Sequence, residues 1–410
     1  MHAFRAGMTT WSVVNDDTRE KRWQDHIPRS LPRYVLLLCL ALVVVSLGVV
    51  LMPARPPVPE QPPFSEQARA AALAETVQLL DAGSKLGAAK QGGSKAGTAT
   101  SVDGPSSDDG NPGIDRTVTL LTTQAHALLA PGENPADAAV AAAAGSGRAT
   151  PPATSTAEPA PSGSGQSDAG ASAAPLPSTP AGLVTALAKS GNQRLADAAV
   201  ADGGMARLLA AVGTAQLLQA SALSVDTETA APAADVASPQ PSGTCPSPSA
   251  SSRSEAAQSG PGQSAAASSL GGALAAVVRT EAQTIYGYQV ALTRLGGDAA
   301  KTAAEELARH DALLDGAESL SRLHCSAVPP REAGYALGPS FLASPAAGLA
   351  DLEGAALPVY GDLVALSEGG TRQWAIAALF GSAKRAVRWG ADPGALPGLD
   401  RASTPTQPAG

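Results

Sequence analysis

Three glutamates and one histidine in the last third of the chain are the residues best suited to carry chemistry. Glu281, Glu306, His310 and Glu353 each fall at helical spacing from neighbouring apolar residues, on the side that a helix would bury. A buried carboxylate must be hydrogen-bonded, paired with a cation, protonated or bound to a metal. Three helices that each direct a carboxylate inward form the ground plan of a ferritin-like site, so we expect these side chains to converge.

Four helices are expected to position them. Apolar residues recur at spacings of three and four, and the glycine pairs at 296–297 and 369–370 end two of the runs. Pro358 falls inside the third run and should kink it. Two short connections and one of about 20 residues join the runs, which is typical of a four-helix bundle. We expect the bundle at 267–392, with helices at 268–295, 298–324, 345–368 and 371–389.

The order and spacing of four segments resemble a known family. The segments are TEAQTIYGYQVALTRLGG, EELARHDALLD, AGYALGPSFLASPAAGLADLE and RQWAIAALFGSAKRAVRWG. Through them, residues 280–394 resemble the ferritin-like domain of uncharacterised actinobacterial membrane proteins, the DUF4439 family. The resemblance implies a ferritin-like bundle tethered to the cell envelope, and it implies no established activity.

The ligand set for a di-iron centre is incomplete. Such a bundle uses one Glu from each of two helices and a Glu-x-x-His motif from each of the other two. Here Glu306 and His310 are four residues apart instead of three, and residues 371–389 contain no acid and no histidine. We therefore expect no cofactor. The alternative is iron or another divalent metal held by Glu281, Glu306, His310 and Glu353.

Cations occupy the positions where further metal ligands would be needed. We expect the inward carboxylates to form ion pairs with arginines and to accept a hydrogen bond from a tyrosine hydroxyl, because buried polar groups are usually satisfied by neighbours. The candidate arginines are Arg309, Arg372 and Arg385, and the candidate tyrosines are Tyr286 and Tyr288.

An apolar run from Tyr34 to Met52 predicts a single transmembrane helix. At 1.5 Å per residue it would span about 28 Å, close to the hydrocarbon thickness of a bilayer. Basic residues are concentrated before the run, at Arg19, Lys21, Arg22, Arg29 and Arg33. This bias predicts a cytoplasmic head at 1–33 and an extracytoplasmic remainder. A cleaved signal peptide is the rival, although its apolar core would be about 7–15 residues long.

Two of the three cysteines are expected outside the cell. Cys39 lies within the apolar run, which leaves Cys245 and Cys325 in a compartment where disulfides persist. A bridge between them would join the segment before the bundle to the end of the bundle's second helix. Bridged and free cysteines both remain open, since sequence gives no geometry.

Composition limits the rest of the chain. With 42 Gly, 34 Pro and 3% aromatic residues, much of its length cannot bury a core. We expect an all-α protein with disordered linkers: a Pro-rich stalk at 53–63, accessory helices with a loop at 64–130, a low-complexity linker at 131–179, a helical pair at 180–224, a second linker at 225–266 and a disordered tail at 393–410. The accessory helices either pack on the bundle or on one another.

These patterns favour a membrane-anchored, extracytoplasmic, non-enzymatic binding or scaffolding module with a degenerate metal site. The alternatives are a metal-dependent oxidoreductase or metal-handling protein, and a lipid or small-molecule binder. The expected partners are the lipid bilayer, through residues 34–52, and an envelope protein or polymer. Lys384 and Arg388 form either a solvated face or a contact with anionic lipid heads or cell-wall polymer. A net charge of −8 without a basic stripe argues against nucleic acid.

Overall fold

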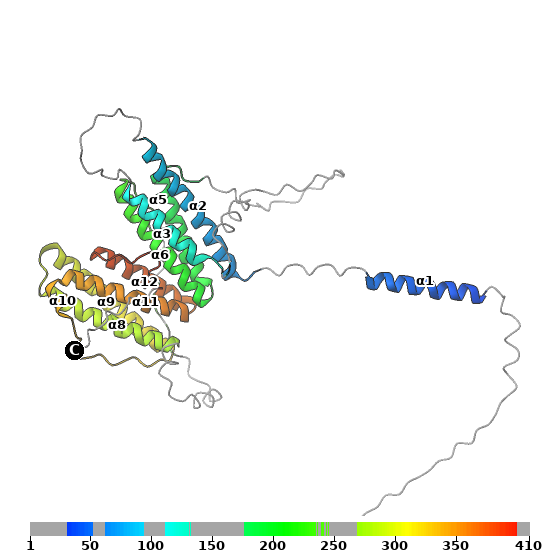
Figure 1. Cartoon of the computed structure of the whole chain (residues 1–410). Coiled ribbons are helices and arrows are strands. Elements are labelled where there is room, and N and C mark those ends of the chain that lie inside the picture. Colours follow the sequence, from blue (N-terminus) through cyan, green and yellow to red (C-terminus); the bar gives the residue numbers. More distant parts are fainter. Residues whose placement is uncertain are drawn as a thin grey trace, which may run out of the picture. The chain divides into compact units, whose positions relative to one another are not determined.

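The computed structural model describes residues 31–51, 62–93, 111–130, 132, 176–234, 236, 239–241, 243, 245 and 269–399. Every regular element in this part of the chain is a helix, so the predicted all-α class is confirmed (Figure 1). Contacts divide the chain into two units, Met1–Gln61 and Pro62–Gly410.

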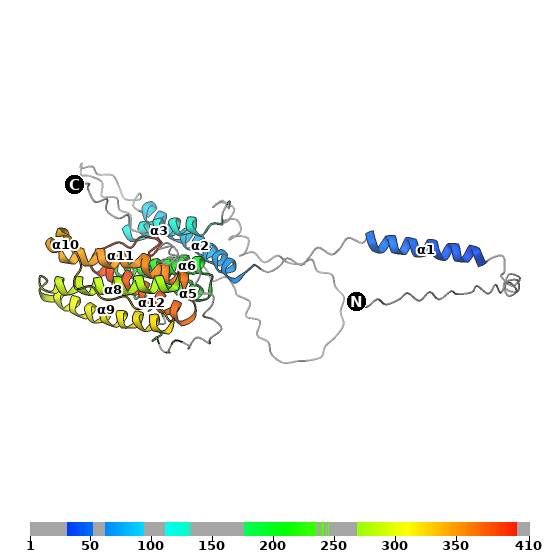
Figure 2. The ribbon, with the colours of Figure 1, turned by 90° about the horizontal axis from the view of Figure 1, so that it is seen from below.

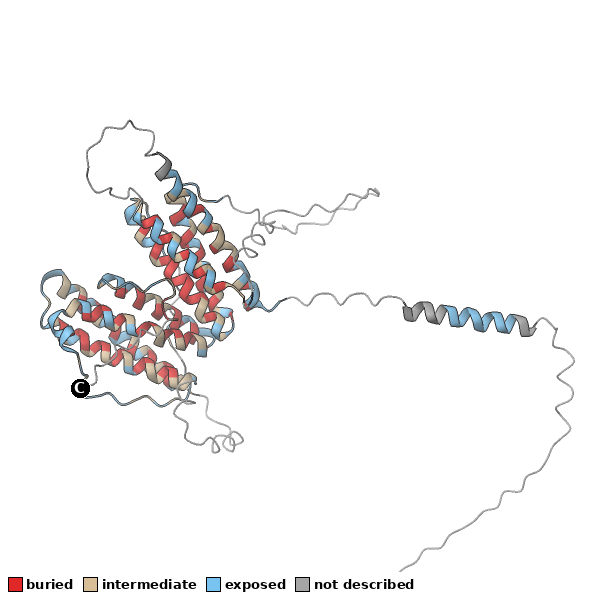
Figure 3. Ribbon diagram, in the orientation of Figure 1, coloured by how far each residue is buried: buried red, intermediate tan, exposed pale blue. Residues whose placement is uncertain are grey.

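The first unit is described through helix α1 (Leu31–Leu51), which contains most of the predicted membrane segment. Its side chains from Tyr34 to Val44 are exposed (Figure 3). Residues 1–30 of the predicted head and 53–61 of the predicted stalk lie outside the described residues. By length and composition alone, one described helix could cross a membrane, namely α6 (Gly203–Asp226), but 67% of its apolar window is buried in the protein; Tyr34–Val44 is a shorter apolar stretch. Membrane insertion of residues 34–52 stays a prediction.

The upstream helices form a four-helix group of their own, here called the N-terminal group. Helix α5 packs along α6, α2 packs along α3, and both pairs contact each other (Figures 1 and 2). Side chains of Asn111 and Thr179 cap the starts of α3 and α5 by accepting hydrogen bonds from backbone N–H groups. The members besides α6 are α2 (Phe64–Gly93), α3 (Pro112–Leu128) and α5 (Pro180–Val200).

Small residues allow α5 and α6 to approach closely. A Cβ atom on Gly213 would lie 2.7 Å from the carbonyl oxygen of Gly191, and one on Gly191 would lie 2.8 Å from Leu217. Gln124, Gln216 and Gln219 are buried nearby and form hydrogen bonds between α3 and α6. The interior of the N-terminal group is thus mostly alanine, leucine and glycine with neutral polar side chains. Arg194 of α5 is its one buried charged side chain among the described residues, and it pairs with Asp197 and Glu75.

The last helices form the C-terminal group. Helix α8 packs on α9 and α11, and α11 packs on α12. The short α10 was not expected; Phe341, which it carries, lies over Gly348, where a Cβ atom would meet the ring at 2.2 Å. Helix α11 continues through Pro358. The members are α8 (Leu270–Leu292), α9 (Gly297–Leu323), α10 (Pro339–Ala343), α11 (Pro345–Leu366) and α12 (Gly369–Arg388).

The two groups share one apolar core. Helix α6 packs on α11, and α5 and α6 contact α12, so buried leucines and alanines from both groups form a continuous cluster. Arg372 joins them further, since its guanidinium donates to the carbonyls of Val364 and Ala201. The accessory helices therefore pack both on one another and on the bundle.

Two segments expected to be disordered are partly packed. Residues 393–399 lie against the helices, where Arg207 and Gln124 donate to the carbonyls of Gly398 and Ala395. In the expected linker 225–266, Ala231 and Val236 pack against the core. These short apolar stretches are too brief to show a periodicity, so only the tertiary contacts reveal them. Most of 131–179, and residues 246–266 and 400–410, lie outside the described residues.

Candidate functional site: a buried ion-pair network

Three helices bring two carboxylates and an imidazole together in the C-terminal group. Glu281 of α8, His310 of α9 and Glu353 of α11 are all fully buried. His310 Nδ1 lies 2.7 Å from Glu281 Oε2, and His310 Nε2 lies 2.8 Å from Glu353 Oε1. The imidazole therefore bridges two carboxylates, with both of its nitrogens engaged.

Helix α12 contributes a cation and a hydroxyl to the same cluster. Arg385 Nε donates to Glu353 Oε1 at 2.8 Å, and the Ser382 hydroxyl donates to Glu353 Oε2 at 2.8 Å. The two residues are three positions apart and so share one face of the helix. Glu353 thus accepts hydrogen bonds on both of its oxygens.

Two tyrosines complete the network. The Tyr288 hydroxyl donates to Glu353 Oε1 at 2.8 Å and accepts from Trp389 Nε1 at 2.8 Å. The Tyr360 hydroxyl donates to Glu281 Oε1 at 2.5 Å. Burial and the neighbouring carboxylates raise the pKa of both tyrosines, so they remain protonated donors.

The network contains two anions and two cations. Burial alone would lower the pKa of His310, but the hydrogen bonds and charges of Glu281 and Glu353 outweigh it and raise this pKa to about 9. Burial alone would raise the pKa of Glu353, but His310 and Arg385 lower it to about 2. Although burial opposes it, attraction to Glu353 raises the pKa of Arg385. At neutral pH an imidazolium and a guanidinium therefore balance the two carboxylates.

Glu306 forms a separate ion pair one turn before His310. Its side chain is fully buried, and Oε1 accepts from Arg309 Nη1 at 2.5 Å and from Arg388 Nη1. The other oxygen, Oε2, is buried without a hydrogen-bond partner. Glu306 therefore faces arginines, and none of its hydrogen bonds reaches His310, Glu281 or Glu353.

The structure brings five of the sequence-predicted residues into one network: Glu281, His310, Glu353, Tyr288 and Arg385. Others lie elsewhere. Arg309 pairs with Glu306, and Arg372 bonds backbone carbonyls between the two groups. Tyr286 packs against Tyr335, with ring centroids 5.7 Å apart. Tyr286 and Arg372 face other directions from their helices, which residue type alone does not reveal.

Sequence reasoning missed Tyr360, Ser382 and the polar role of Trp389. Tyr360 lies four residues after Ala356 and three before Leu363, within the apolar stripe of α11. Ser382 lies three residues after Leu379 and three before Arg385. A hydroxyl at stripe spacing was therefore the available signal, but an aromatic or small residue there equally suits a core.

These residues do not fit a divalent metal. A metal ligand must offer a free lone pair, whereas the His310 nitrogens donate to carboxylates as an imidazolium. Arg385, within hydrogen-bonding distance of Glu353, adds a second positive charge where a cation would bind. Among the described residues, no group of three or more His, Cys, Asp or Glu side chains is arranged to hold a metal ion.

The disulfide lies at the end of the same helix that carries His310. Cys245 and Cys325 are bonded, with their Cα atoms 5.2 Å apart. Cys325 lies two residues after the last residue of α9, so the bond ties the segment after α6 to the C-terminal group.

Comparison with known proteins bears only on this last part of the chain. Comparisons with curated proteins and with solved structures found no significant match. The family comparison confirms the match to DUF4439 that was read from the sequence, and the matched region includes every residue of the network. Residues 273–401 match the family model of DUF4439, a domain of unknown function.

Proposed function

We propose that the protein is a membrane-anchored, extracytoplasmic helical module that acts without a metal or a catalytic step, as a binding or scaffolding element. One observation carries the proposal: both nitrogens of His310 are hydrogen-bonded to carboxylates of neighbouring helices. The residues that would hold iron in a ferritin-like site are instead bonded to one another, as in a degenerate metal site.

The network is also poorly placed for catalysis. A general base or nucleophile must reach a substrate within hydrogen-bonding distance. Glu281, His310 and Glu353 are fully buried, and each has a partner in the protein. Their arrangement favours a structural role, which is to hold α8, α9, α11 and α12 together through charge and hydrogen bonds.

The proposed location rests on the sequence flanking α1 and on the disulfide. The five basic residues before the apolar run favour an N-terminus in the cytoplasm. A disulfide between Cys245 and Cys325 is typical of an oxidising compartment. Protease added to intact spheroplasts should digest the chain after residue 52, and protection of that part would contradict the orientation.

Metal content and metal response test the function. Full-length protein purified from its native membranes in non-ionic detergent should contain no stoichiometric metal by elemental analysis. Its melting temperature should be the same in EDTA as with added iron, manganese or zinc, because His310 and Arg385 already pair with Glu281 and Glu353. Stoichiometric metal that disappears in Glu281→Ala but persists in Glu305→Ala, an exposed glutamate of α9, would instead establish the metal-handling alternative.

A further inference from the structure

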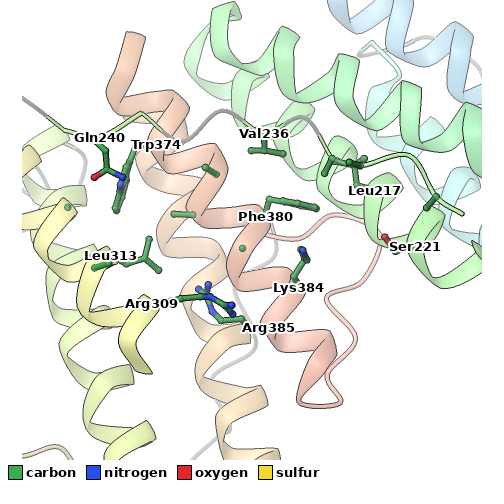
Figure 4. A pocket seen from close by; sticks show the side chains of 18 of the residues that line it. Leu217, Ser221, Val236, Gln240, Arg309, Leu313, Trp374, Phe380, Lys384 and Arg385 are labelled. Atoms are coloured by element: carbon green, nitrogen blue, oxygen red, sulfur yellow. The ribbon is translucent and has the colours of Figure 1, made fainter. Parts of the chain in front are cut away.

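A cavity of about 730 Å³ lies between the two helical groups. It is bounded by α6, α9, α12 and the described residues of segment 231–240 (Figure 4). Its volume is in the range of small-molecule sites, which are mostly apolar with a few convergent polar groups. The apolar wall includes Leu217, Val236, Leu313, Trp374 and Phe380.

The charged residues that line this cavity are all cations. They are Arg309, Lys384 and Arg385, and no acidic residue is among the described residues that line it. In Figure 4 the three side chains gather at one end of the cavity, below Phe380 and away from Gln240. The cavity therefore has a cationic end and apolar walls.

Arg385 connects the buried network to the cavity. Its Nε is bonded to Glu353, but its Nη2 is buried and has no hydrogen-bond partner. The residue is only 6% exposed. A buried guanidinium donor without an acceptor is costly, and an anionic oxygen is the acceptor it pairs with most strongly.

Lys384 adds a cation at the solvent side. Its Nζ lies 5.6 Å from the centre of the Phe380 ring, and it forms no ion pair within the described part of the chain. Arg309 is already bonded to Glu306, so it contributes a partly balanced charge. Lys384 and the free Nη2 of Arg385 are therefore the groups available to a ligand.

We propose that this cavity binds an amphipathic anion whose carboxylate or phosphate head contacts Arg385 and Lys384 and whose hydrocarbon chain lies along Leu217, Val236 and Leu313. The proposal names the ligand class for the binding role proposed above. An inorganic anion alone would leave the apolar wall unfilled, and a neutral lipid would leave the Arg385 donor unpaired.

Trp374 in the wall provides a local reporter. Full-length protein in phosphatidylcholine nanodiscs is titrated with a long-chain brominated fatty acid, a brominated monoacyl phosphate or the matching brominated alcohol, and tryptophan quenching is followed. The Trp374→Phe variant supplies the background from the other tryptophans. We expect saturable, Trp374-dependent quenching by one or both anions and not by the alcohol.

Competition identifies the head group. Displacement of the bound probe by inorganic phosphate, with preference for the monoacyl phosphate, assigns a lipid phosphate; preference for the fatty acid without such displacement assigns a carboxylate. Either result supports the proposal. Equal quenching by the alcohol, or no saturable quenching by any probe, overturns it.

Two variants keep the test independent of folding, because both change exposed residues. Lys384→Gln should raise the dissociation constant about tenfold, the size expected for loss of a charged hydrogen bond, whereas Lys301→Gln, at an exposed lysine of α9 away from the cavity, should leave it unchanged. Ala312→Trp should block binding without altering charge. Unchanged binding in both Lys384→Gln and Ala312→Trp would place the ligand elsewhere and overturn the site.

Metal content does not enter these measurements, so this proposal and the metal-free function can fail separately.

Discussion

The two helical groups of residues 62–399 fill their interiors with different chemistry. The N-terminal group packs glycine against glycine and uses mostly neutral amides, as in the bond from Gln216 Nε2 to Gln124 Oε1; Arg194 is the one buried charged side chain among its described residues. The C-terminal group buries two carboxylates, an imidazolium and a guanidinium in mutual contact. Both are helical and share an apolar core, so the difference lies in how each stabilises its interior.

This difference predicts different weaknesses. A buried charge cluster depends on every partner and on protonation, because a charge left alone in the interior is strongly destabilising. A glycine-packed interface is insensitive to pH but has no room for added atoms. Mutations and changes of pH should therefore affect the stability of the two groups differently.

The largest effect is expected at Glu353. Glu353→Ala removes the shared partner of His310, Arg385, Tyr288 and Ser382 and leaves two cations under-paired. We expect the free energy of unfolding to fall by about 3–5 kcal/mol in urea denaturation followed by circular dichroism. Asp351→Ala, an exposed change on the same helix, is the control. A loss in Glu353→Ala no greater than in the control would show that the network does not stabilise the fold.

The next effect is expected from pH. The pKa of His310 is about 9, against an ordinary value of 6.5, so the folded state favours the protonated ring. The resulting stabilisation should be fully present below pH 6.5 and should be lost as the pH rises through 9, for a total of about 3 kcal/mol. Hydrogen exchange should show α8, α9 and α11 opening more easily at high pH than α5 and α6. In His310→Gln this difference should disappear; if it persists, another group is responsible.

A smaller effect is expected where the N-terminal group is tightest. In Gly213→Ala the new Cβ atom would lie 2.7 Å from the Gly191 carbonyl oxygen and 2.8 Å from Leu195. We expect a loss of about 1–3 kcal/mol in the free energy of unfolding, which exceeds the gain in helix propensity. Gly204→Ala, where nothing lies within 4 Å, should be neutral or slightly stabilising. Equal behaviour of the two variants would mean that the close approach of α5 and α6 is not required.

The smallest effect is expected for a neutral polar residue. Gln216→Leu loses one hydrogen bond to Gln124 but also removes Gln216 Oε1, which is buried without a partner. We expect the free energy of unfolding to change by less than about 1 kcal/mol, because the two contributions oppose each other. Chemical denaturation measures it, and a loss as large as that of Glu353→Ala would remove the distinction between the two interiors.

Helical spacing was sufficient to predict the all-α fold and to predict that Glu281, His310 and Glu353 converge. It could not choose among the arginines, because α12 carries Arg372 and Arg385 on different faces and only packing on α11 decides which reaches Glu353. It also could not find Tyr360, whose partner Glu281 is 79 positions away along the chain. Pairings between distant segments depend on how helices dock, and alanine-rich stripes carry little information about docking.

The last described residues contact a helix from the earlier half of the chain. Gly398 adopts a φ of +88°, which suits glycine, and its carbonyl accepts from Nε and Nη2 of Arg207, 191 positions earlier. Arg207 also pairs with Asp362 at 2.6 Å. During synthesis, this contact between Arg207 and Gly398 can therefore form only after nearly the whole polypeptide has been made. Shortening the chain before residue 393 would leave Arg207 without its carbonyl acceptor.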